Sequence, residues 1–502
     1  MKKYIICLSV AMIFTSLSGC KKFLDVESIT ALSGNKFWST QADVESFTNN
    51  LYAQLWAKFS SAPFISSTGE LRSGEILPSV DGNYNSNNTT SRVVYRSFGI
   101  NDLKTVLVSG RAWTNLNFAS ITRWLEFYQV IQGSNIMYDK VDRGIPGMSD
   151  IDTKRYKAEA VFIRCFTYFY MVRLFGDVAY YTDAYHSDPI GRENFVSVLN
   201  KCIAELAASR NDLPWKYEDA AFNGFRANKG AAIDLLMNMN MWNAGFDQAN
   251  KQNYYATTQL LGQEIVTSNA YSLVPLSRLP TVMEGGTEEG LFAFKQGVDF
   301  GTPNKNAFPG EILVAYPQKG NTAANGTYSN AYFRSSYINK IYNLDEDDRL
   351  ASWFVNPTAN DGIFSMKKFA GSLSSTGFPD WAIVMFRYAD AVLLRAEAAA
   401  ELGMDQEAVD MLNLVRDRAG ATLFEIGSAE NLKDAIFRER QREFIGEGYS
   451  FFDLVRTRKI TDGNWTSNPL TLAQFNEGAW TWPIDASALT RNPFMTLNSY
   501  WL

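Results

Sequence analysis

Hydrophobic residues recur at the spacing of amphipathic α-helices in three blocks of the chain. In the first block, residues 113–175, one helix is predicted within RWLEFYQVIQGSNIMYDKV and a second within DTKRYKAEAVFIRCFTYFYMVRLFGD. Phe162, Phe166 and Phe169 fall roughly on one face of the second helix. Gly176 is the expected stop, because glycine adopts the left-handed conformation that ends many helices.

The second and third blocks contain further helices that suggest pairing. The second holds ENFVSVLNKCIAELAA, FRANKGAAIDLLMNMNMWNAG and YYATTQLLGQEIVTS. In the third, FRYADAVLLRAEAAAELG is followed after a short turn by QEAVDMLNLVRDRAG. Ala408, Leu412 and Val415 share one face there, and Gly420 is the predicted cap. We expect an antiparallel pair, and similar pairs upstream at the repeat of about 34 residues typical of tetratricopeptide-like units.

Two long stretches, from Phe64 to Asp102 and from Val274 to Gly377, lack this periodicity and are rich in Gly, Asn, Ser or Pro. Short strand-like pieces such as GLFAFKQ and EILVAYP interrupt the second stretch. Irregular segments of this length are usually functional or disordered, and their aromatic content argues against simple disorder. The prediction is a mainly α fold: a tetratricopeptide-like helical repeat scaffold of about four helix pairs, with long irregular insertions and short strands.

Composition narrows the class of protein. The 502 residues are 46% hydrophobic and include 34 Phe, 24 Tyr and 12 Trp, which suits a large core and leaves rings available as binding platforms. The net charge is −6 and no long basic stripe occurs, so we expect no nucleic-acid partner.

The first twenty residues have the pattern of a signal peptide. Lys2 and Lys3 precede an apolar run over residues 4–17, which is short for a membrane span. The sequence LSGC ending at Cys20 resembles a bacterial lipobox, in which the cysteine becomes the lipidated first residue of the mature protein. We therefore expect a signal peptide over residues 1–19 and a lipid anchor on Cys20; the alternative is an ordinary secretory signal.

Cleavage and lipidation would leave two cysteines, Cys165 and Cys202, both in helical patterns without metal-like spacing. Buried free thiols are the favoured interpretation, and a disulfide in an oxidising compartment is the alternative.

No catalytic motif is apparent. Beyond the signal segment the chain has a single histidine, His186, in a loop, and no nucleophile-elbow motif. GGTEEG lacks the Lys-Ser/Thr of a phosphate loop and is interpreted as a turn. LDEDDR does not have EF-hand spacing and is interpreted as a solvated acidic turn. We predict no cofactor and no metal site.

One segment, RERQREFIGEGYSFFDLVR, is dense in paired charges. Glycosidases use two carboxylates, but carboxylates on such a helix are mostly neutralised by partners at i+3 or i+4. We interpret Glu439, Arg440, Arg442 and Glu443 as a structural charge network.

Seven segments in order resemble the SusD/RagB family of Bacteroidetes outer-membrane lipoproteins. They are GCKKFLDV, AEAVFIRCFTYFYMVRLFGDVAYYT, NKGAAIDLLMNMNMW, FRYADAVLLRAEAAAELG, AVDMLNLVRDRAG, LKDAIFRERQREFIGEGYSFFDLVRTRK and WPIDASALTRNPFMTLNSYW. The chain departs from the family pattern where ES replaces the proline after the lipidated start. It also lacks the usual glutamate after the Ile-Pro pair near its end.

The resemblance implies a single SusD-like domain over residues 20–502. Its scaffold would span about 35–60, 113–270 and 380–460, and its ligand-facing insertions about 64–102 and 274–377. The protein would be lipid-anchored on the outer face of the outer membrane. It would pair with a SusC-like TonB-dependent transporter, deliver an oligosaccharide and not be an enzyme.

Sugar binding needs aromatic platforms together with hydrogen-bonding side chains, and both insertions supply that mixture. The candidate ligand residues are Asp81, Asn83, Tyr84, Arg92 and Tyr95 in the first insertion, and Phe308, Tyr316, Tyr328 and Tyr332 in the second. Two alternatives stay open. The ligand could be a peptide or another nutrient, or the protein could be a surface hydrolase with an overlooked carboxylate pair.

Overall fold

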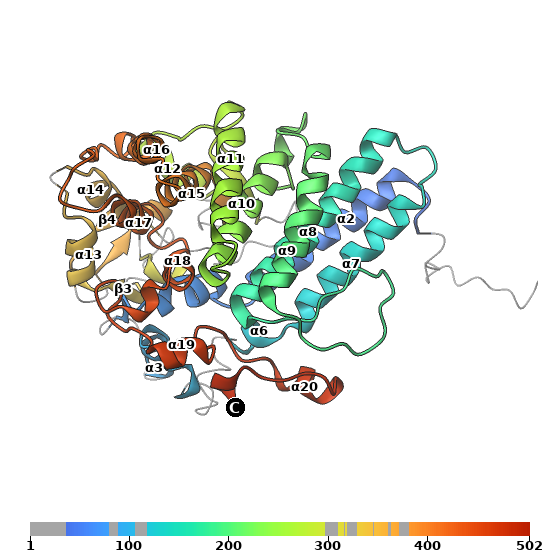
Figure 1. Ribbon diagram of the computed structural model, residues 1–502, viewed down its shortest axis with the longest axis horizontal. Helices are drawn as coiled ribbons and strands as arrows, with labels where there is room; N and C mark the ends of the chain where they lie inside the picture. The colour runs from blue at the N-terminus through green and yellow to red at the C-terminus, as the bar shows by residue number, and fades with distance from the viewer. Residues whose placement is uncertain are drawn as a thin grey trace, which may run out of the picture.

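The computed structural model describes residues 37–79, 89–105, 118–296, 310–315, 317–318, 329–344, 346–359, 363–370 and 381–502. Within these residues, eight helices form an array in which each helix packs on the next (Figure 1). In order of packing they are α2 (Gln41–Phe59), α7 (Leu125–Asp142), α8 (Asp150–Phe175), α9 (Phe195–Ser209), α10 (Lys229–Phe246), α11 (Lys251–Thr267), α15 (Tyr388–Glu401) and α16 (Asp405–Arg418). The predicted mainly helical fold with paired helices is confirmed.

Helix α8 is the centre of the first half of the array. It begins after Ser149, whose hydroxyl accepts a hydrogen bond from the Asp152 backbone N–H at 3.1 Å. It ends at the predicted Gly176, where φ is +72°. All residues from 158 to 175 are buried, so the prediction of a single apolar face underestimated its burial. A helix covered on every side needs apolar or paired side chains all round.

The predicted C-terminal pair also forms, with α15 packed along α16. Gly420, the predicted cap, has a φ of +58° and follows the end of α16. The remaining helices are shorter: α3 (Thr89–Gly99), α6 (Ala119–Thr122), α12 (Leu279–Val282), α13 (Ser335–Ile341), α14 (Arg349–Trp353), α17 (Leu432–Glu443), α18 (Ser450–Arg456), α19 (Leu472–Asn476) and α20 (Ala486–Arg491).

Three short antiparallel strand pairs tie the insertions to each other and to the array. β1 (Ile76–Pro78) pairs with β3 (Ala331–Phe333), which joins the first insertion to the second. β2 (Gly290–Phe294) pairs with β6 (Ile383–Arg387), and β4 (Phe354–Val355) with β5 (Ser365–Met366). A π-helix, η2 (Ser66–Glu70), and helix α3 lie in the first insertion, which is therefore more regular than predicted.

The hydrophobic core lies between the helical array and the β2–β6 pair. The ring of Phe166 on α8 is 5.3 Å from that of Phe292 and 5.8 Å from that of Phe386, centroid to centroid. Phe59 on α2 stacks on Phe294 at 5.5 Å. These edge-on and stacked contacts bury large apolar surfaces and hold the strands against the helices.

Cys165 and Cys202 are both buried and free, and the Cys165 thiol donates to the Cys202 carbonyl at 3.5 Å. Cys20 lies outside the described residues. Among the helices described, none is both long and apolar enough to cross a bilayer.

Candidate functional site

A hollow of about 260 Å³ lies beside α2 and the end of β2. We call it the aromatic hollow, because it is lined by the rings of Tyr52, Trp56, Phe222, Phe225 and Phe294. Asn49, Arg226 and Lys295 add polar groups, and Ala53 and Ala221 complete the wall. Apolar walls with a few convergent polar groups are typical of small-molecule sites.

Helix α2 supplies one wall because Asn49, Tyr52 and Trp56 recur at the spacing of one helical face. The helix starts from a capping box: Thr40 accepts from the Asp43 backbone N–H, and the Asp43 carboxylate accepts from the Thr40 backbone N–H at 2.8 Å. The cap fixes where α2 begins and therefore which side chains face the hollow.

Phe225 is positioned by a glycine turn, which is the GGTEEG segment predicted from the sequence to be a turn. Gly285 and Gly286 have φ angles of +80° and +74°. A Cβ atom on Gly285 would lie 2.4 Å from the Phe225 ring. Glycine therefore permits both the backbone conformation and the close approach of the ring.

Replacing Gly285 by alanine is expected to lower the free energy of unfolding by roughly 2 kcal/mol and to displace Phe225. About half of the loss comes from placing a Cβ at positive φ, and the rest from the clash. Gly427→Ala is the matched control, because Gly427 has a φ of +93° and open space around its Cβ. Urea denaturation of both variants measures the difference; equal losses would contradict the contact with Phe225.

Arg226 lines the aromatic hollow and is 3% exposed. Its Nε donates to Glu159 at 2.6 Å and its Nη1 to Glu45 at 2.5 Å. Burial raises the pKa of Glu45, but the hydrogen bond and charge of Arg226 outweigh it, so this pKa is lowered overall. Arg226 Nη2 is buried and has no hydrogen-bond partner among the described residues. An incoming oxygen atom could satisfy that donor.

The other polar groups in the lining belong to Asn49, Lys295 and Tyr52. The Asn49 side chain is exposed and makes no hydrogen bond within the described part of the chain. The Lys295 ammonium lies 4.9 Å from the centre of the Phe225 ring. The Tyr52 hydroxyl is already used, because it accepts from the Ala227 backbone N–H and donates to Glu159. The arrangement offers ring faces for C–H groups and donors for hydroxyl oxygens.

Of the residues predicted from the sequence, the two whose side chains the structure describes, Tyr95 and Tyr332, do not line this hollow. Asp81, Asn83, Tyr84, Phe308, Tyr316 and Tyr328 lie outside the described residues, as does the side chain of Arg92. Tyr95 is 1% exposed and packs edge-on against Phe118. Tyr332 is 6% exposed and lies in β3. Neither of these two rings is open to a ligand in this structure, so we do not carry them into the proposed site.

Sequence reasoning missed all the residues of the aromatic hollow. Its walls come from a scaffold helix, from the segment before α10 and from the end of β2, not from the irregular parts of the insertions. A usable signal was present in GLFAFKQ, where a short strand with two Phe is followed by a lysine at the start of an irregular stretch.

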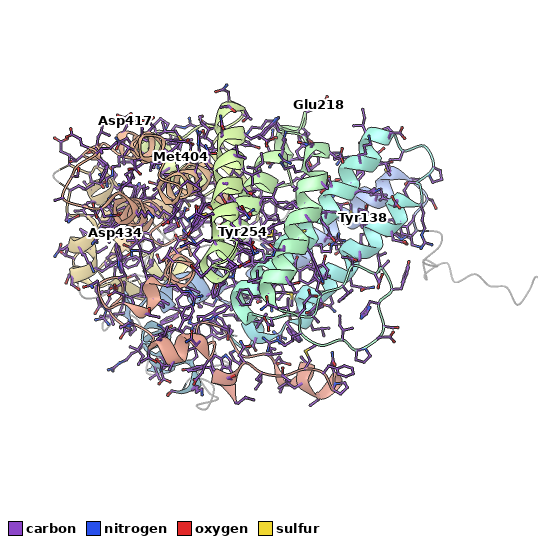
Figure 2. The ribbon with its side chains drawn as sticks, in the orientation of Figure 1. Tyr138, Glu218, Tyr254, Met404, Asp417 and Asp434 are labelled. Carbon is purple, nitrogen blue, oxygen red and sulfur yellow. The ribbon has the colours of Figure 1, made fainter. Side chains whose placement is uncertain are left out.

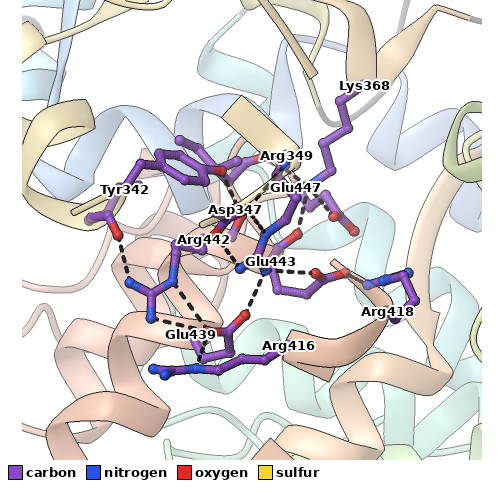
Figure 3. Close-up of polar contacts among 12 residues, drawn as sticks. Tyr342, Asp347, Arg349, Lys368, Arg416, Arg418, Glu439, Arg442, Glu443 and Glu447 are labelled. Atoms are coloured by element: carbon purple, nitrogen blue, oxygen red, sulfur yellow. Dashed lines mark hydrogen bonds and ion pairs between the residues drawn. The ribbon is translucent and has the colours of Figure 1, made fainter. Parts of the chain in front are cut away.

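The predicted charge network is present, but its connections differ from the prediction (Figure 3). Glu439 and Glu443 are both 0% exposed. Only Arg442 reaches Glu439 from the same helix, at 3.1 Å. Arg349 pairs with both carboxylates, at 2.6 and 3.1 Å, from far along the sequence. The partners are therefore mostly long-range rather than at i+3 or i+4.

This network does not have the properties of a glycosidase pair. A catalytic acid needs a raised pKa and access to substrate. Burial raises the pKa of Glu439, but the charges of Arg349, Arg442 and Arg416 outweigh it and lower this pKa to about 2. A carboxylate held ionised and enclosed by guanidinium groups cannot donate a proton to a leaving group.

One smaller prediction is corrected. Asp347 of LDEDDR is not solvated: its side chain is 5% exposed and pairs with Arg349 at 2.7 Å. His186, the single histidine, is partly buried, and its ring stacks on Tyr181 at 4.7 Å. Among the described residues, no group of three or more His, Cys, Asp or Glu side chains could hold a metal ion.

Comparisons with known proteins agree with the fold. The sequence model of the SusD family matches residues 313–501, and a model described as "Starch-binding associating with outer membrane" matches residues 22–240. A SusD-like protein of Formosa agariphila is 24% identical, over 96% of this chain and 96% of its own.

Solved structures are similar as well. A SusD homologue of Bacteroides thetaiotaomicron is 33% identical and superposes with a TM-score of 0.83, over 93% of this chain and 100% of its own. A protein described as a laminarin-binding SusD-like protein is 19% identical, with a TM-score of 0.67 over 92% and 99% of the two chains. Because the Bacteroides thetaiotaomicron homologue matches at this identity over its whole length, the chain belongs to the SusD/RagB family.

Proposed function

We propose that this protein is a cell-surface glycan-binding lipoprotein that captures an oligosaccharide and delivers it to a SusC-like TonB-dependent outer-membrane transporter. The observation that carries the proposal is the aromatic hollow, which is lined by five rings together with Arg226, whose Nη2 has no hydrogen-bond partner among the described residues. A sugar ring presents apolar C–H faces flanked by hydroxyls, and this hollow offers partners for both.

Family membership supports the surface role. One of the two matching family descriptions names starch binding and association with the outer membrane, and one similar structure is described as binding laminarin. The lipobox at Cys20 would supply the anchor and keep the protein near its transporter at high local concentration. The helical array offers an extended surface for that transporter.

The insertion residues remain part of the proposal. Tyr84 of the first insertion and Tyr316 of the second stay candidate ligand residues. Alanine substitution at each is the direct check, since loss of sugar affinity in either variant would place that ring at the ligand.

A calorimetric screen of oligosaccharides and peptides on the purified mature protein tests the proposal. Oligosaccharide binding without turnover is expected. Binding of peptides alone would favour a peptide-uptake role, and product formation would favour the hydrolase. A transporter partner is tested by asking whether a neighbouring gene encodes an outer-membrane barrel and whether that barrel copurifies with this protein.

Replacing Phe225 by alanine is expected to weaken oligosaccharide binding roughly tenfold, or about 1.4 kcal/mol, because a stacking face is lost. Phe225 is only partly buried, so the fold should survive. Phe494→Ala is the control, since Phe494 is 58% exposed and does not line the hollow. Unchanged affinity in the Phe225 variant, measured by calorimetry with an oligosaccharide from the screen, would remove the aromatic hollow from the site.

A further inference from the structure

A second hollow, of about 480 Å³, lies where α10, α11, α15 and α17 meet the segment after α18. We call it the cationic hollow, because five cationic and three acidic side chains line it. Asp434, which is one of the three acids, is labelled on that part of the array in Figure 2. Three ion pairs account for its acids: Glu397 with Arg456, Glu401 with Lys433, and Asp434 with Lys459. Two cations, Lys251 and Arg458, have no acidic partner in the described part of the chain.

Arg458 is held in place with its charged end open. Its guanidinium lies against two neighbouring aromatic rings, 4.5 Å from the centre of Phe246 and 4.3 Å from that of Phe475. Its Nε donates to the Gly245 carbonyl at 3.0 Å. Neither Nη atom hydrogen-bonds to a residue that the structure describes. A planar cation fixed by stacking loses little freedom when it binds an anion.

The backbone at Arg458 is also unusual. Its φ is +63°, a left-handed conformation that non-glycine residues rarely adopt and that costs about 1 kcal/mol or more. The nearby Gly245 makes this arrangement possible, because a Cβ there would lie 2.0 Å from the Arg456 carbonyl oxygen. Strain of this kind persists where surrounding contacts impose it, and it is concentrated at functional sites.

The chemistry of the hollow favours a carboxylate over a sugar ring. Two rings line the hollow: Phe437 is 3% exposed, and Tyr255 is partly exposed. A single partly exposed ring is a poor stacking platform for a sugar, and five cations stand in the same lining. Paired Nη atoms match the two oxygens of a carboxylate, and Lys251 can receive a second anionic group.

We propose that the cationic hollow binds an acidic segment of a partner polypeptide, with one carboxylate bidentate on the Nη atoms of Arg458 and another beside Lys251. Extended surfaces on helical repeats suit polypeptide partners. The net positive lining stands out against the chain's charge of −6 and would attract acidic residues. The proposal rests on the proposed transporter partnership for the partner's identity, but not on the glycan site.

The test is fluorescence anisotropy of a labelled hexaglutamate peptide with the purified mature protein at low salt. We expect saturable binding that Arg458→Gln weakens at least tenfold and Lys251→Gln about threefold. Arg458→Lys should recover little affinity, because lysine cannot make the bidentate contact. The Arg458→Lys variant also keeps the test valid if Arg458→Gln does not fold. Arg143→Gln is the control, since Arg143 directly follows α7, is 67% exposed and removes one positive charge far from the hollow's lining.

Three results would overturn the proposal. The first is an Arg458 variant that binds hexaglutamate as tightly as the wild type. The second is an equal loss in Arg143→Gln. The third is tighter binding of a hexagalacturonate oligosaccharide than of the peptide, which would assign the hollow to acidic sugars. The same variants should bind the screened neutral oligosaccharides with unchanged affinity in calorimetry. A failure of the cationic hollow as a peptide site can therefore be distinguished from a failure of the aromatic hollow as a glycan site.

Discussion

Replacing Glu443 by alanine is expected to lower the free energy of unfolding by about 3–5 kcal/mol, the usual loss when one partner of a buried ion pair is removed. Glu443 is 0% exposed and pairs with Arg387 at 2.7 Å, with Arg349 at 3.1 Å and with Arg418. Burial raises the pKa of this carboxyl, but the charges of Arg418, Arg387 and Arg349 prevail and hold the pKa well below its usual range. Without it, three guanidinium groups lose a shared counter-charge.

Urea denaturation of wild type and Glu443→Ala measures this loss. The control is Glu288→Ala, which breaks the Arg278–Glu288 pair at 2.6 Å, where the two side chains are 50% and 42% exposed. Solvent screens that pair, so its removal should cost about 1 kcal/mol or less. Similar losses in the two variants would show that the buried network is no more important than a surface ion pair.

The network matters because it joins parts of the chain that helix packing alone does not connect. Arg349 starts α14 and Arg387 ends β6, and both reach Glu443 on α17. Lys368, in the second insertion, donates to the backbone carbonyls of Glu443 at 2.7 Å and Ile445 at 3.0 Å. The same carboxylate region therefore fastens the second insertion to the helical array.

The helices could be predicted because their signals are local. Ser149 caps the start of α8, glycines follow the ends of α8 and α16, and periodicity covers the residues within each helix. The partners of Glu443 could not be predicted in the same way. Arg349 is 94 residues away, and no spacing rule joins the two. Local rules predicted partners within α17, and only the Arg442–Glu439 pair fits them.

The candidate site also depends on tertiary contacts that local sequence patterns cannot predict. Composition located aromatic residues in the insertions, but it could not say which rings face solvent. Tyr95 and Tyr332 were equally good candidates by sequence, and both are buried because packing against neighbouring rings and strands removes their apolar surface from water. The aromatic hollow instead combines Trp56, Phe225 and Phe294 from three separated segments, which only the tertiary fold brings together.

Raising the pH from about 4.5 to 7 is expected to destabilise the protein through Glu70 by about 3 kcal/mol. Glu70 is 0% exposed, and its carboxylate accepts from the Gly448 backbone N–H at 2.8 Å and from the Ser450 hydroxyl. The two segments touch closely, because a Cβ on Gly69 would lie 1.9 Å from the Gly448 carbonyl oxygen. Burial in this contact raises the pKa of Glu70 from 4.5 to about 7.

The sign follows from proton binding. Between pH 4.5 and 7 the folded protein keeps the Glu70 proton that the unfolded chain releases, so this contribution to stability is complete below the unfolded pKa and is lost as the pH approaches the folded one. A pKa difference of one unit corresponds to about 1.4 kcal/mol. The rise in the pKa of Glu70 from 4.5 to about 7 therefore corresponds to roughly 3 kcal/mol of unfolding free energy. Glu439 has a pKa of about 2, so its contribution to stability is lost as the pH falls below about 4.5. The effects of Glu70 and Glu439 therefore occur in different pH ranges and can be measured separately.

Glu70→Gln isolates the effect, because glutamine keeps an oxygen acceptor for Gly448 and cannot ionise. The difference in unfolding free energy between variant and wild type should shift by about 3 kcal/mol in favour of the variant between pH 4.5 and 8. Glu288→Gln is the control: Glu288 is exposed and its pKa is lowered by Arg278, so it is ionised in both states over most of that range. Parallel stability curves for wild type and Glu70→Gln would show that Glu70 is ionised in the folded protein. The contact between η2 and Gly448 would then have to hold a buried charge without a cationic hydrogen-bond partner among the described residues.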